Sequence, residues 1–333
     1  MVCKSLLSWF CAETLVSRIL SYNNFIKRKR LRIIKKNFFF IYNFTQIFTL
    51  NMEIKNLENT DFDTIFRGFQ RAFADYEIHF EKEEVREMLH RRGYSPRLSF
   101  AAFDKDEIVA FTLNGIGSFN GLPSAYDTGT GTAKEYRGQG LAGKIFNHSI
   151  PYLKEAGIDQ YVLEVLQNNT NAIAVYRKMN FEATREFDCF RQTIENIQNP
   201  TPGEIDYAIK PIGIEEVKAA QTFLDFTPSW QNSIESIKRG EAALTFLGAG
   251  IEGKLAGFCV FDPATGDLTQ IAVKPEYRRR GIASQLLKSA IESMKTDFIK
   301  VLNVSSDNQT LPRFLASKNI PLATKQFEMI LPL

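Results

Sequence analysis

The sequence predicts a mixed α/β fold, in which a mixed β-sheet packs with helices and the whole unit is built twice along the chain. Similar segments recur in the two parts of the sequence, and in each part strand-like runs alternate with segments of helical period. Hydrophobic residues make up 44% of the 333 residues, which is enough to bury sizeable cores. At roughly 150 residues per domain, a chain of this length would hold two domains, in agreement with the repeat.

Composition excludes several classes of protein. No apolar stretch reaches the roughly 20 residues that a membrane-spanning helix needs. Outside the first 51 residues acidic side chains slightly outnumber basic ones, so nothing indicates a nucleic-acid partner. The cysteines are too few and too scattered for a disulfide framework or a zinc site, so we expect a cytoplasmic protein without a metal. They are Cys3, Cys11, Cys189 and Cys259.

Residues 1–51 form a basic leader that we exclude from the fold. They hold nine lysines and arginines against a single acid, Glu13, and contain neither glycine nor proline. An organelle presequence and a membrane-surface anchor both have such a composition. Because the composition changes abruptly at Met52, a third interpretation is that translation begins there, and we expect 1–51 to be disordered or not translated.

The repeat defines two predicted domains. The clearest echo is an Arg/Gly-rich run that starts at Arg137 and recurs at Arg278, each time after Glu-Tyr. A stretch rich in Asn, Pro and Gly separates the copies and has the composition of a linker. We therefore predict an N-terminal domain over 52–197, a linker over 198–204 and a C-terminal domain over 205–333.

The sequences of the two copies predict the same order of secondary-structure elements. A short strand leads into helical sequence, then come a hairpin, a further strand, a helix, a β-rich strand, a second helix and a terminal strand. The strands before the terminal one are expected at 54–57, 99–103, 108–113, 125–132 and 161–166, and at 207–212, 245–247, 255–261, 268–273 and 298–304. We place the second hairpin turn at Gly248-Ala249-Gly250 and expect Pro312 to disturb the last helix of the second copy.

The Arg/Gly-rich run lies where a strand ends and a helix begins. Free backbone N–H groups at a helix N-terminus form an anion site, and glycine lets the backbone approach a phosphate closely. The stretch Gly138 to Gly143 also matches the dinucleotide fingerprint GxGxxG, with Glu164 as a ribose-binding acid. We reject that interpretation because the second copy lacks the pattern and because residues 248–253 match it inside a hairpin.

The pattern common to both copies, Arg-x-x-Gly-x-Ala, resembles the acetyl-CoA-binding turn of the GNAT acyltransferase superfamily. The run from Asn169 to Phe181 is similar to a second GNAT motif, Asn-x-x-Ala-x-x-x-Tyr with a Gly-Phe end, except that Asn180 replaces the glycine. The resemblance covers 52–333 and implies two tandem GNAT-type folds with acetyl-CoA as co-substrate. The binding residues it implies are Thr130, Gly131, Thr132, Arg137, Gly138, Gln139, Gly140, Leu141, Ala142 and Asn169, with Arg278, Gly281 and Ala283 in the second copy.

The resemblance also implies an N-acetyltransferase that moves the acetyl group directly to an amine. Glu164 and Tyr176 are spaced as in the protein N-terminal acetyltransferases of the family, where the Glu is the base and the Tyr the acid. In the second copy Asn303 and Leu315 fall at these positions, and neither can transfer a proton. We therefore expect chemistry in the first domain and a degenerate second domain.

Two questions stay open in the sequence. A GNAT-fold protein that binds acyl-CoA without turnover, as a regulatory protein, is the alternative function. The acceptor could be a small molecule, such as a polyamine, an aminoglycoside or an amino acid, or a peptide or protein N-terminus. The sequence indicates neither which acyl group is preferred nor how many chains assemble. The three histidines, His79, His90 and His148, read as surface residues, and the glutamates at 81–87 read as a solvated helix face.

Overall fold

The computed structural model describes residues 52–75, 80–198 and 207–333. The leader, 1–51, and most of the predicted linker lie outside these ranges, as does His79. Residues 53–333 form one compact unit, to which the description below is confined. We call 52–197 the first copy and 205–333 the second copy.

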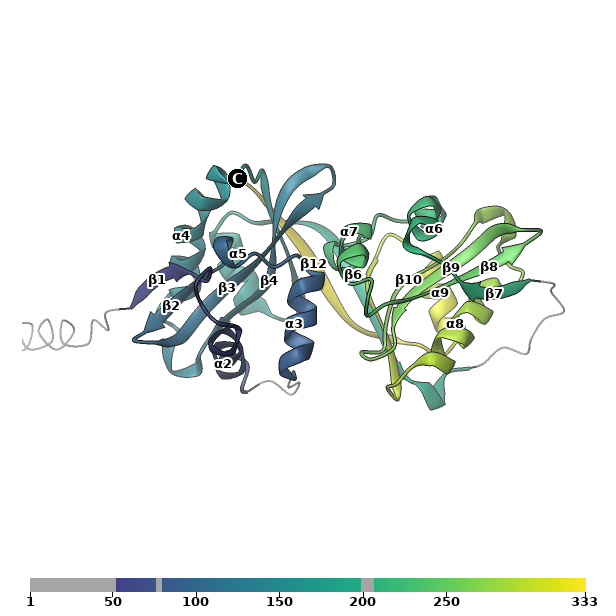
Figure 1. Ribbon diagram of the computed structural model, residues 1–333, viewed down its shortest axis with the longest axis horizontal. Helices are drawn as coiled ribbons and strands as arrows, with labels where there is room; N and C mark the ends of the chain where they lie inside the picture. The colour runs from purple at the N-terminus through teal and green to yellow at the C-terminus, as the bar shows by residue number, and fades with distance from the viewer. Residues whose placement is uncertain (1–51, 76–79, 199–206) are drawn as a thin grey trace, which may run out of the picture. The chain divides into compact units, whose positions relative to one another are not determined.

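One mixed sheet of 12 strands runs through this unit, in the order β1-β2-β3-β4-β5-β12-β6-β11-β10-β9-β8-β7 (Figure 1). The strands of the first copy are β1 Glu53–Asn56, β2 Phe100–Asp104, β3 Glu107–Phe119, β4 Leu122–Thr132, β5 Gln160–Leu166 and β6 Glu182–Thr193. Those of the second copy are β7 Ala208–Pro211, β8 Thr245–Ile251, β9 Lys254–Asp262, β10 Asp267–Val273, β11 Phe298–Ser305 and β12 Leu322–Pro332.

Helices connect the strands where the sequence changes to a helical period. The α-helices are α2 Phe62–Ala72, α3 Lys82–Arg91, α4 Leu141–Glu155 and α5 Thr170–Lys178, then α6 Ile214–Ala219, α7 Ile234–Arg239, α8 Ile282–Ser293 and α9 Thr310–Ser317. The short 3-10 turns are η1 Pro96–Leu98, η2 Lys134–Tyr136, η3 Ile194–Asn196, η4 Ala220–Phe223, η5 Trp230–Asn232 and η6 Pro275–Tyr277. The mixed α/β fold and its duplication are confirmed.

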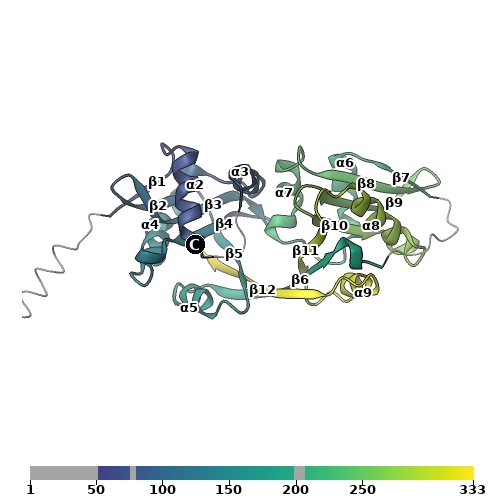
Figure 2. The same cartoon turned by 90° about the horizontal axis from the view of Figure 1, so that it is seen from below.

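The two copies exchange their terminal strands. β6, the last strand of the first copy, pairs antiparallel with β11, and β12, the last strand of the second copy, pairs with β5 along its length. β6 and β12 also pair with each other, and Figure 2 shows β12 running from beside α9 toward β5. Because backbone hydrogen bonds of each terminal strand go to the other copy, neither copy has a complete sheet without its neighbour.

Two sequence expectations were wrong. The hairpin turn of the second copy lies at Glu252-Gly253, which have φ of 51° and 75°, and not at 248–250. Gly248 instead lies within β8. A Cβ at this position would lie 2.6 Å from Cγ2 of Ile212, so the glycine is needed for packing and not for a turn. Pro312 does not disturb α9, because it stands in the first turn of the helix, where its missing N–H would have had no intrahelical partner.

Candidate active site

In each copy two parallel strands begin side by side and then part. β4 pairs with β5 only from Ser124 to Tyr126, and β10 pairs with β11 only at Asp267. Just beyond these points β4 and β10 each carry a register shift against their other neighbour, near Asp127 and between Leu268 and Gln270. We call the unpaired parts, 127–132 with 163–166 and 268–273 with 301–305, the first and second wedge. In these ranges the Thr128 carbonyl accepts from Arg92 at 2.9 Å and the Leu302 carbonyl from Asn232 at 2.8 Å, so a ligand could bind only to the backbone groups that remain.

A turn with left-handed glycines leads from the first wedge into α4. Gly138 and Gly140 have φ of 78° and 72°, and Gly140 is the N-cap of the helix. The first intrahelical bond is donated by Lys144 N–H to the Gly140 carbonyl, at 3.1 Å. Within the described residues, the amides of 138–143 donate to no acceptor, and no atom lies within 4 Å of a Cβ built on either glycine. Open space in front of free amides at a helix N-terminus fits a diphosphate.

Arg137 fastens this turn to the end of α2. Its guanidinium pairs with Asp75 at 2.7 Å and donates to the carbonyls of Ala72 and Thr132 at 2.9 and 3.1 Å. This contact holds the pKa of Asp75 at about 2. The resemblance implied that Arg137 is one of the residues that bind the ligand. In the structure its charge is shared with Asp75, so the arginine also positions the turn.

The second copy repeats this arrangement closely. Arg278 pairs with Asp225 at 2.8 Å and donates to the carbonyls of Phe223 and Val273 at 3.2 and 2.9 Å. Gly281, with φ of 82°, is the N-cap of α8 and has no side-chain cap. The turn and its anchor therefore have the same geometry in both copies.

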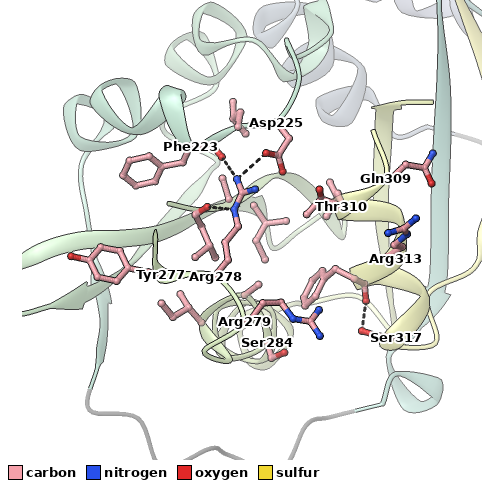
Figure 3. Close-up of a pocket in the computed structure, with 18 of the residues that line it drawn as sticks. Phe223, Asp225, Tyr277, Arg278, Arg279, Ser284, Gln309, Thr310, Arg313 and Ser317 are labelled. Atoms are coloured by element: carbon pink, nitrogen blue, oxygen red, sulfur yellow. Dashed lines mark hydrogen bonds and ion pairs between the residues drawn. The ribbon is translucent and has the colours of Figure 1, made fainter. Parts of the chain in front are cut away.

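A pocket of about 510 Å³ lies between this second turn and α9 (Figure 3). It is lined by polar and basic groups and by apolar residues of the 223–226 segment and of β10, and the lining also includes Asp225, which pairs with Arg278. The polar lining includes Arg278, Arg279, Ser284, Gln309, Arg313 and Ser317. Such a lining suits an anionic ligand with an apolar arm.

Tyr176, the predicted acid, lies on α5 and faces Asp127 of the first wedge. Its hydroxyl donates to Asp127 Oδ2 at 3.2 Å, and the Thr130 hydroxyl donates to the same oxygen at 2.8 Å. Burial raises the pKa of Asp127 to about 6. Sequence reasoning missed Asp127, although its position beside the predicted thioester-binding residues could have pointed to it.

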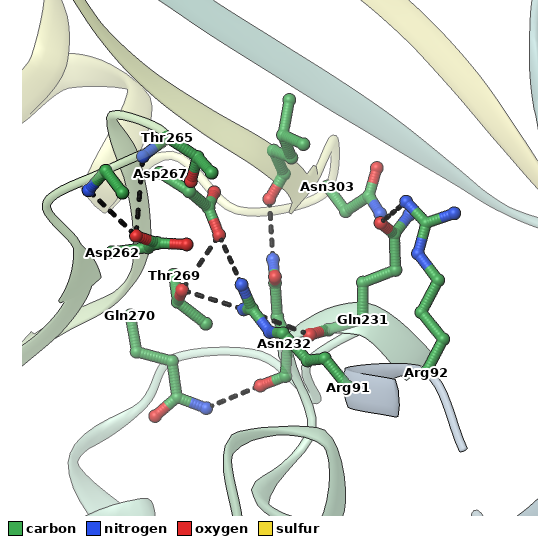
Figure 4. Close-up of polar contacts among 12 residues, drawn as sticks. Arg91, Arg92, Gln231, Asn232, Asp262, Thr265, Asp267, Thr269, Gln270 and Asn303 are labelled. Atoms are coloured by element: carbon green, nitrogen blue, oxygen red, sulfur yellow. Dashed lines mark hydrogen bonds and ion pairs between the residues drawn. The ribbon is translucent and has the colours of Figure 1, made fainter. Parts of the chain in front are cut away.

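Glu164, the predicted base, lies on β5 and is held by both copies. Its Oε2 accepts from the Tyr126 hydroxyl at 2.9 Å and from the amide of Gln231, which belongs to η5 of the second copy. Arg92 in turn donates to Gln231 Oε1 at 2.5 Å (Figure 4). Glu164 Oε1 is buried without a hydrogen-bond partner among the described residues. Burial is the main cause that raises the pKa of this carboxyl.

Tyr176 and Glu164 lie on opposite faces of β5. Tyr176 packs with the odd-numbered side chains of the strand, Leu163 and Val165, in the cluster that α4 and α5 cover. The even-numbered Val162 packs with Trp230 of η5. Because side chains alternate along a strand, Glu164 points to the face of Trp230 and away from Tyr176. The predicted acid and the predicted base therefore lie on opposite faces of the sheet beside the same wedge.

The second copy supplies much of the surface around Glu164. Trp230 stacks on Tyr126 with ring centroids 5.1 Å apart. Glu328 of the exchanged strand β12 is directly opposite Glu164, almost fully buried, and paired with Arg185 at 2.5 Å. Arg91 of α3 reaches across to Asp267 at 3.0 Å, as Figure 4 shows. The second copy thus forms one wall of the base's surroundings.

The remaining predicted site residues have identifiable positions. Asn169 caps α5 by accepting from Ala172 N–H at 3.2 Å, and Thr130, Gly131 and Thr132 pair with β3 along the wedge. In the turn, Gln139 is exposed, Leu141 is buried and Ala142 is half-buried, as is its counterpart Ala283. The structure therefore brings Thr130 to Thr132 and the turn to the edges of one wedge.

Other reactive side chains lie away from this centre. His90 is exposed, and Cys189 and Cys259 are buried free thiols whose pKa burial raises, that of Cys259 to about 12. Within the described residues, no cluster of His, Cys, Asp and Glu could hold a metal ion. No helix in that part of the chain has the length and apolar character to cross a membrane.

Two curated N-alpha-acetyltransferases are similar to part of the chain. Over 87 residues the chain is 31% identical to N-alpha-acetyltransferase 30 of Schizosaccharomyces pombe, and over 86 residues it is 29% identical to N-alpha-acetyltransferase MAK3 of Arabidopsis thaliana. Each match covers 26% of this chain, and the chain spans 58% and 45% of the length of these two relatives.

Solved structures extend the likeness to both copies. A tandem GNAT protein from the clavulanic acid biosynthesis pathway superposes with a TM-score of 0.66 at 13% identity, over 84% of this chain and 98% of that one. A GCN5-related N-acetyltransferase from Sphaerobacter thermophilus gives 0.61 at 15% identity, over 84% and 95%. The model of the acetyltransferase (GNAT) family matches residues 62–181 and again 213–317. With most of both copies matched, the chain belongs to the acetyltransferase (GNAT) family as a tandem member.

Proposed function

We propose that the protein is an N-acetyltransferase that moves the acetyl group of acetyl-CoA directly to an amine, with the chemistry in the first copy. In this proposal the turn from Arg137 to Ala142 binds the diphosphate of the co-substrate. The thioester enters the first wedge beside Thr130 to Thr132, and Asn169 lies along the pantetheine arm. No metal takes part.

The observation that carries the proposal is the placement of two proton-transfer groups on either side of one wedge. An attacking alkyl amine has a pKa near roughly 10 and must lose a proton, while the departing thiolate must gain one. Glu164, which has an unpartnered buried oxygen, is suited to take the proton of the amine. Tyr176, on the other face, is suited to protonate the sulfur.

We propose an α-amino group as the acceptor, at the start of a peptide or on a small molecule. The names of the two curated relatives support this choice, because both are N-alpha-acetyltransferases. The surroundings of Glu164 are compatible with this acceptor. An amine that approaches Glu164 would contact Gln231 and Trp230 of the second copy. We place the reaction in the cytoplasm, as the scarcity of cysteine favours.

A second function, binding of acyl-CoA without turnover, fits the second copy. Its turn and its pocket of about 510 Å³ are present, whereas Asn303 and Leu315 stand where the first copy has Glu164 and Tyr176. We propose that Arg278, Gly281 and Ala283 hold a CoA-type ligand that the second copy does not consume.

Release of free thiol from acetyl-CoA tests the proposal. Residues 52–333 are incubated with acetyl-CoA and a panel of amines that includes short peptides with free N-termini, a polyamine, an aminoglycoside and free amino acids. We expect amine-dependent thiol release and an acetylated product of the added mass. Tight acetyl-CoA binding without thiol release for any amine would instead favour the non-catalytic alternative.

A further inference from the structure

Asp127 occupies the point where β4 leaves β5. The last paired residue of β4 is Tyr126, and the register of β4 against β3 shifts directly after Asp127. The carboxyl is fixed there by the hydroxyls of Tyr176 and Thr130, which both donate to Oδ2. A rigid carboxyl therefore lies directly behind the hydroxyl that faces the departing sulfur in the proposed reaction.

The surroundings of Asp127 favour its neutral form. Its Oδ1 is buried and has no hydrogen-bond partner among the described residues, and an unpartnered oxygen costs more when the group is charged. The charged and titratable groups that act on the carboxyl are Arg92, Tyr126, Tyr161 and Tyr176. The hydrogen bonds from Thr130 and Tyr176 favour ionisation, as does the charge of Arg92, but burial outweighs them, so the pKa of Asp127 rises to about 6.

In the second copy neither Asp127 nor Tyr176 has a polar counterpart. Leu268 takes the place of Asp127 and Leu315 takes the place of Tyr176, and both leucines are fully buried in one apolar cluster. The Arg278 anchor and the glycine turn remain beside them. The carboxyl is thus kept where the tyrosine is kept and is absent where the tyrosine is absent.

We propose that Asp127 is a positioning and proton-relay residue that supplies a proton to Tyr176 while Tyr176 protonates the leaving thiolate. This inference rests on the proposed acetyl transfer. The inference names the source of the proton that Tyr176 passes to sulfur. Without such a source, Tyr176 would become a buried phenolate beside a carboxylate, which is unfavourable.

The step balances as follows. The neutral amine attacks the thioester carbonyl carbon, so a C–N bond forms and the C–S bond breaks with its electron pair on sulfur. When the carboxyl of Asp127 is neutral, its Oδ2–H becomes the donor of the 3.2 Å hydrogen bond with Tyr176, and the tyrosine hydroxyl is free to donate to sulfur. The hydroxyl proton of Tyr176 then moves to sulfur, and the carboxyl proton of Asp127 moves to the tyrosine oxygen. The extra proton of the amine goes to Glu164, which later releases it to solvent, while Asp127 takes a proton back from solvent.

The test replaces Asp127 by asparagine, which keeps the size and a hydrogen bond to Tyr176 but holds no transferable proton. We expect kcat to fall about 10²-fold with the KM for acetyl-CoA changed less than about threefold. Since the neutral carboxyl is the active form, the wild-type chemical rate should fall as the pH rises through the pKa of Asp127, and D127N should lack this limb. D127N should fold, because it removes a buried carboxyl without an adverse change in shape.

A second donor separates a relay from a structural role. The acetyl thioester of an acidic aryl thiol leaves without needing a proton, so D127N and wild type should then differ by less than about threefold. Thr130→Val removes the other hydrogen bond to Oδ2 but not the proton, so it should keep the pH limb and move it to higher pH, because that bond lowers the pKa of Asp127. Only its pH profile is compared, since Thr130 also lines the proposed thioester site.

The outcomes are distinct. If wild type transfers acetyl and D127N matches its kcat and pH profile, the relay is wrong while the proposed function stands. If D127N is equally slow with both donors, its defect is structural and the relay is likewise overturned. If wild type releases no thiol with any amine, the proposed function and the relay fall together.

Discussion

The two wedges keep the same backbone and differ in their reactive side chains. In both, an arginine pairs with an aspartate and fastens a turn whose glycine caps the following helix: Arg137 with Asp75, and Arg278 with Asp225. In the first wedge the side chains that can move protons are Asp127, Glu164 and Tyr176. In the second, the same places hold Leu268, Asn303 and Leu315.

This difference teaches that ligand binding and proton transfer depend on separate parts of the fold. The anion-binding turn depends on backbone conformation, which one glycine and one anchored arginine maintain. In the proposed reaction, proton transfer depends on three side chains, which are absent from the second copy although its turn is kept. A duplicated unit can therefore lose its chemistry and keep its pocket.

The largest effect is expected from separating the copies. Expressed alone, 52–197 would lack β12 beside β5 and β11 beside β6, so two strands would have unpaired edges. We expect no cooperative thermal unfolding and extensive aggregation, measured by circular dichroism and size-exclusion chromatography against 52–333. A monomeric, cooperatively folding fragment would mean that the copies are independent domains.

The next largest effect concerns the acid of the first wedge. Tyr176→Phe keeps the ring but removes the hydroxyl that donates to Asp127, so kcat should fall about 10²–10⁴-fold. The matched control is Leu315→Met at the equivalent place in the second copy, which should change kcat little. Equal losses in both variants would mean that the loss comes from disturbed packing and not from the missing hydroxyl, which would contradict the role of Tyr176 as the acid.

Counting bound ligands sharpens the comparison further. If both turns hold a CoA-type ligand, titration calorimetry of 52–333 with CoA should give two sites per chain. Arg278→Ala releases the second turn from Asp225 and should weaken one site about tenfold without removing the other. A single site in the wild-type protein, lost in Arg137→Ala, would mean that the second copy binds no CoA.

The smallest effect is one of backbone strain. Arg279 has φ of 61° at the place where the first copy has Gly138 with φ of 78°. Because left-handed backbone costs a residue with a side chain about 1–2 kcal/mol, Arg279→Gly should stabilise the protein by about 0.5–1 kcal/mol. Gly138→Ala should destabilise it by about 1 kcal/mol, and urea unfolding of the two variants gives both values.

The repeat and the order of elements were predictable because hydrophobic period and turn chemistry are local properties of the sequence. The strand exchange was not predictable, because the sequences of β6 and β12 indicate that they are strands but do not indicate which copy each strand pairs with. Gly248 was read as a turn, since the sequence does not reveal that Ile212 would collide with a side chain there.

The residues of the candidate site also fall into those that the sequence predicts and those that it does not. Tyr176, Glu164 and the two turns could be found from motif spacing along the chain. Gln231 could not, because it acquires its place through contact with Glu164, which is distant in sequence. Asp127 was missed although it stands close to the predicted Thr130, because its contact with Tyr176 is formed only in the fold. Gln231 moreover comes from the other copy, so no motif of a single GNAT unit contains it.

A crystal structure of 52–333 with bound acetyl-CoA tests the central claim most directly. The account predicts a diphosphate on the amides of 138–142 and a thioester between β4 and β5, with its sulfur within hydrogen-bond reach of Tyr176. Should the only thioester lie against α9 in the second wedge, or the diphosphate bind away from both turns, the assignment of the chemistry to the first copy would be contradicted.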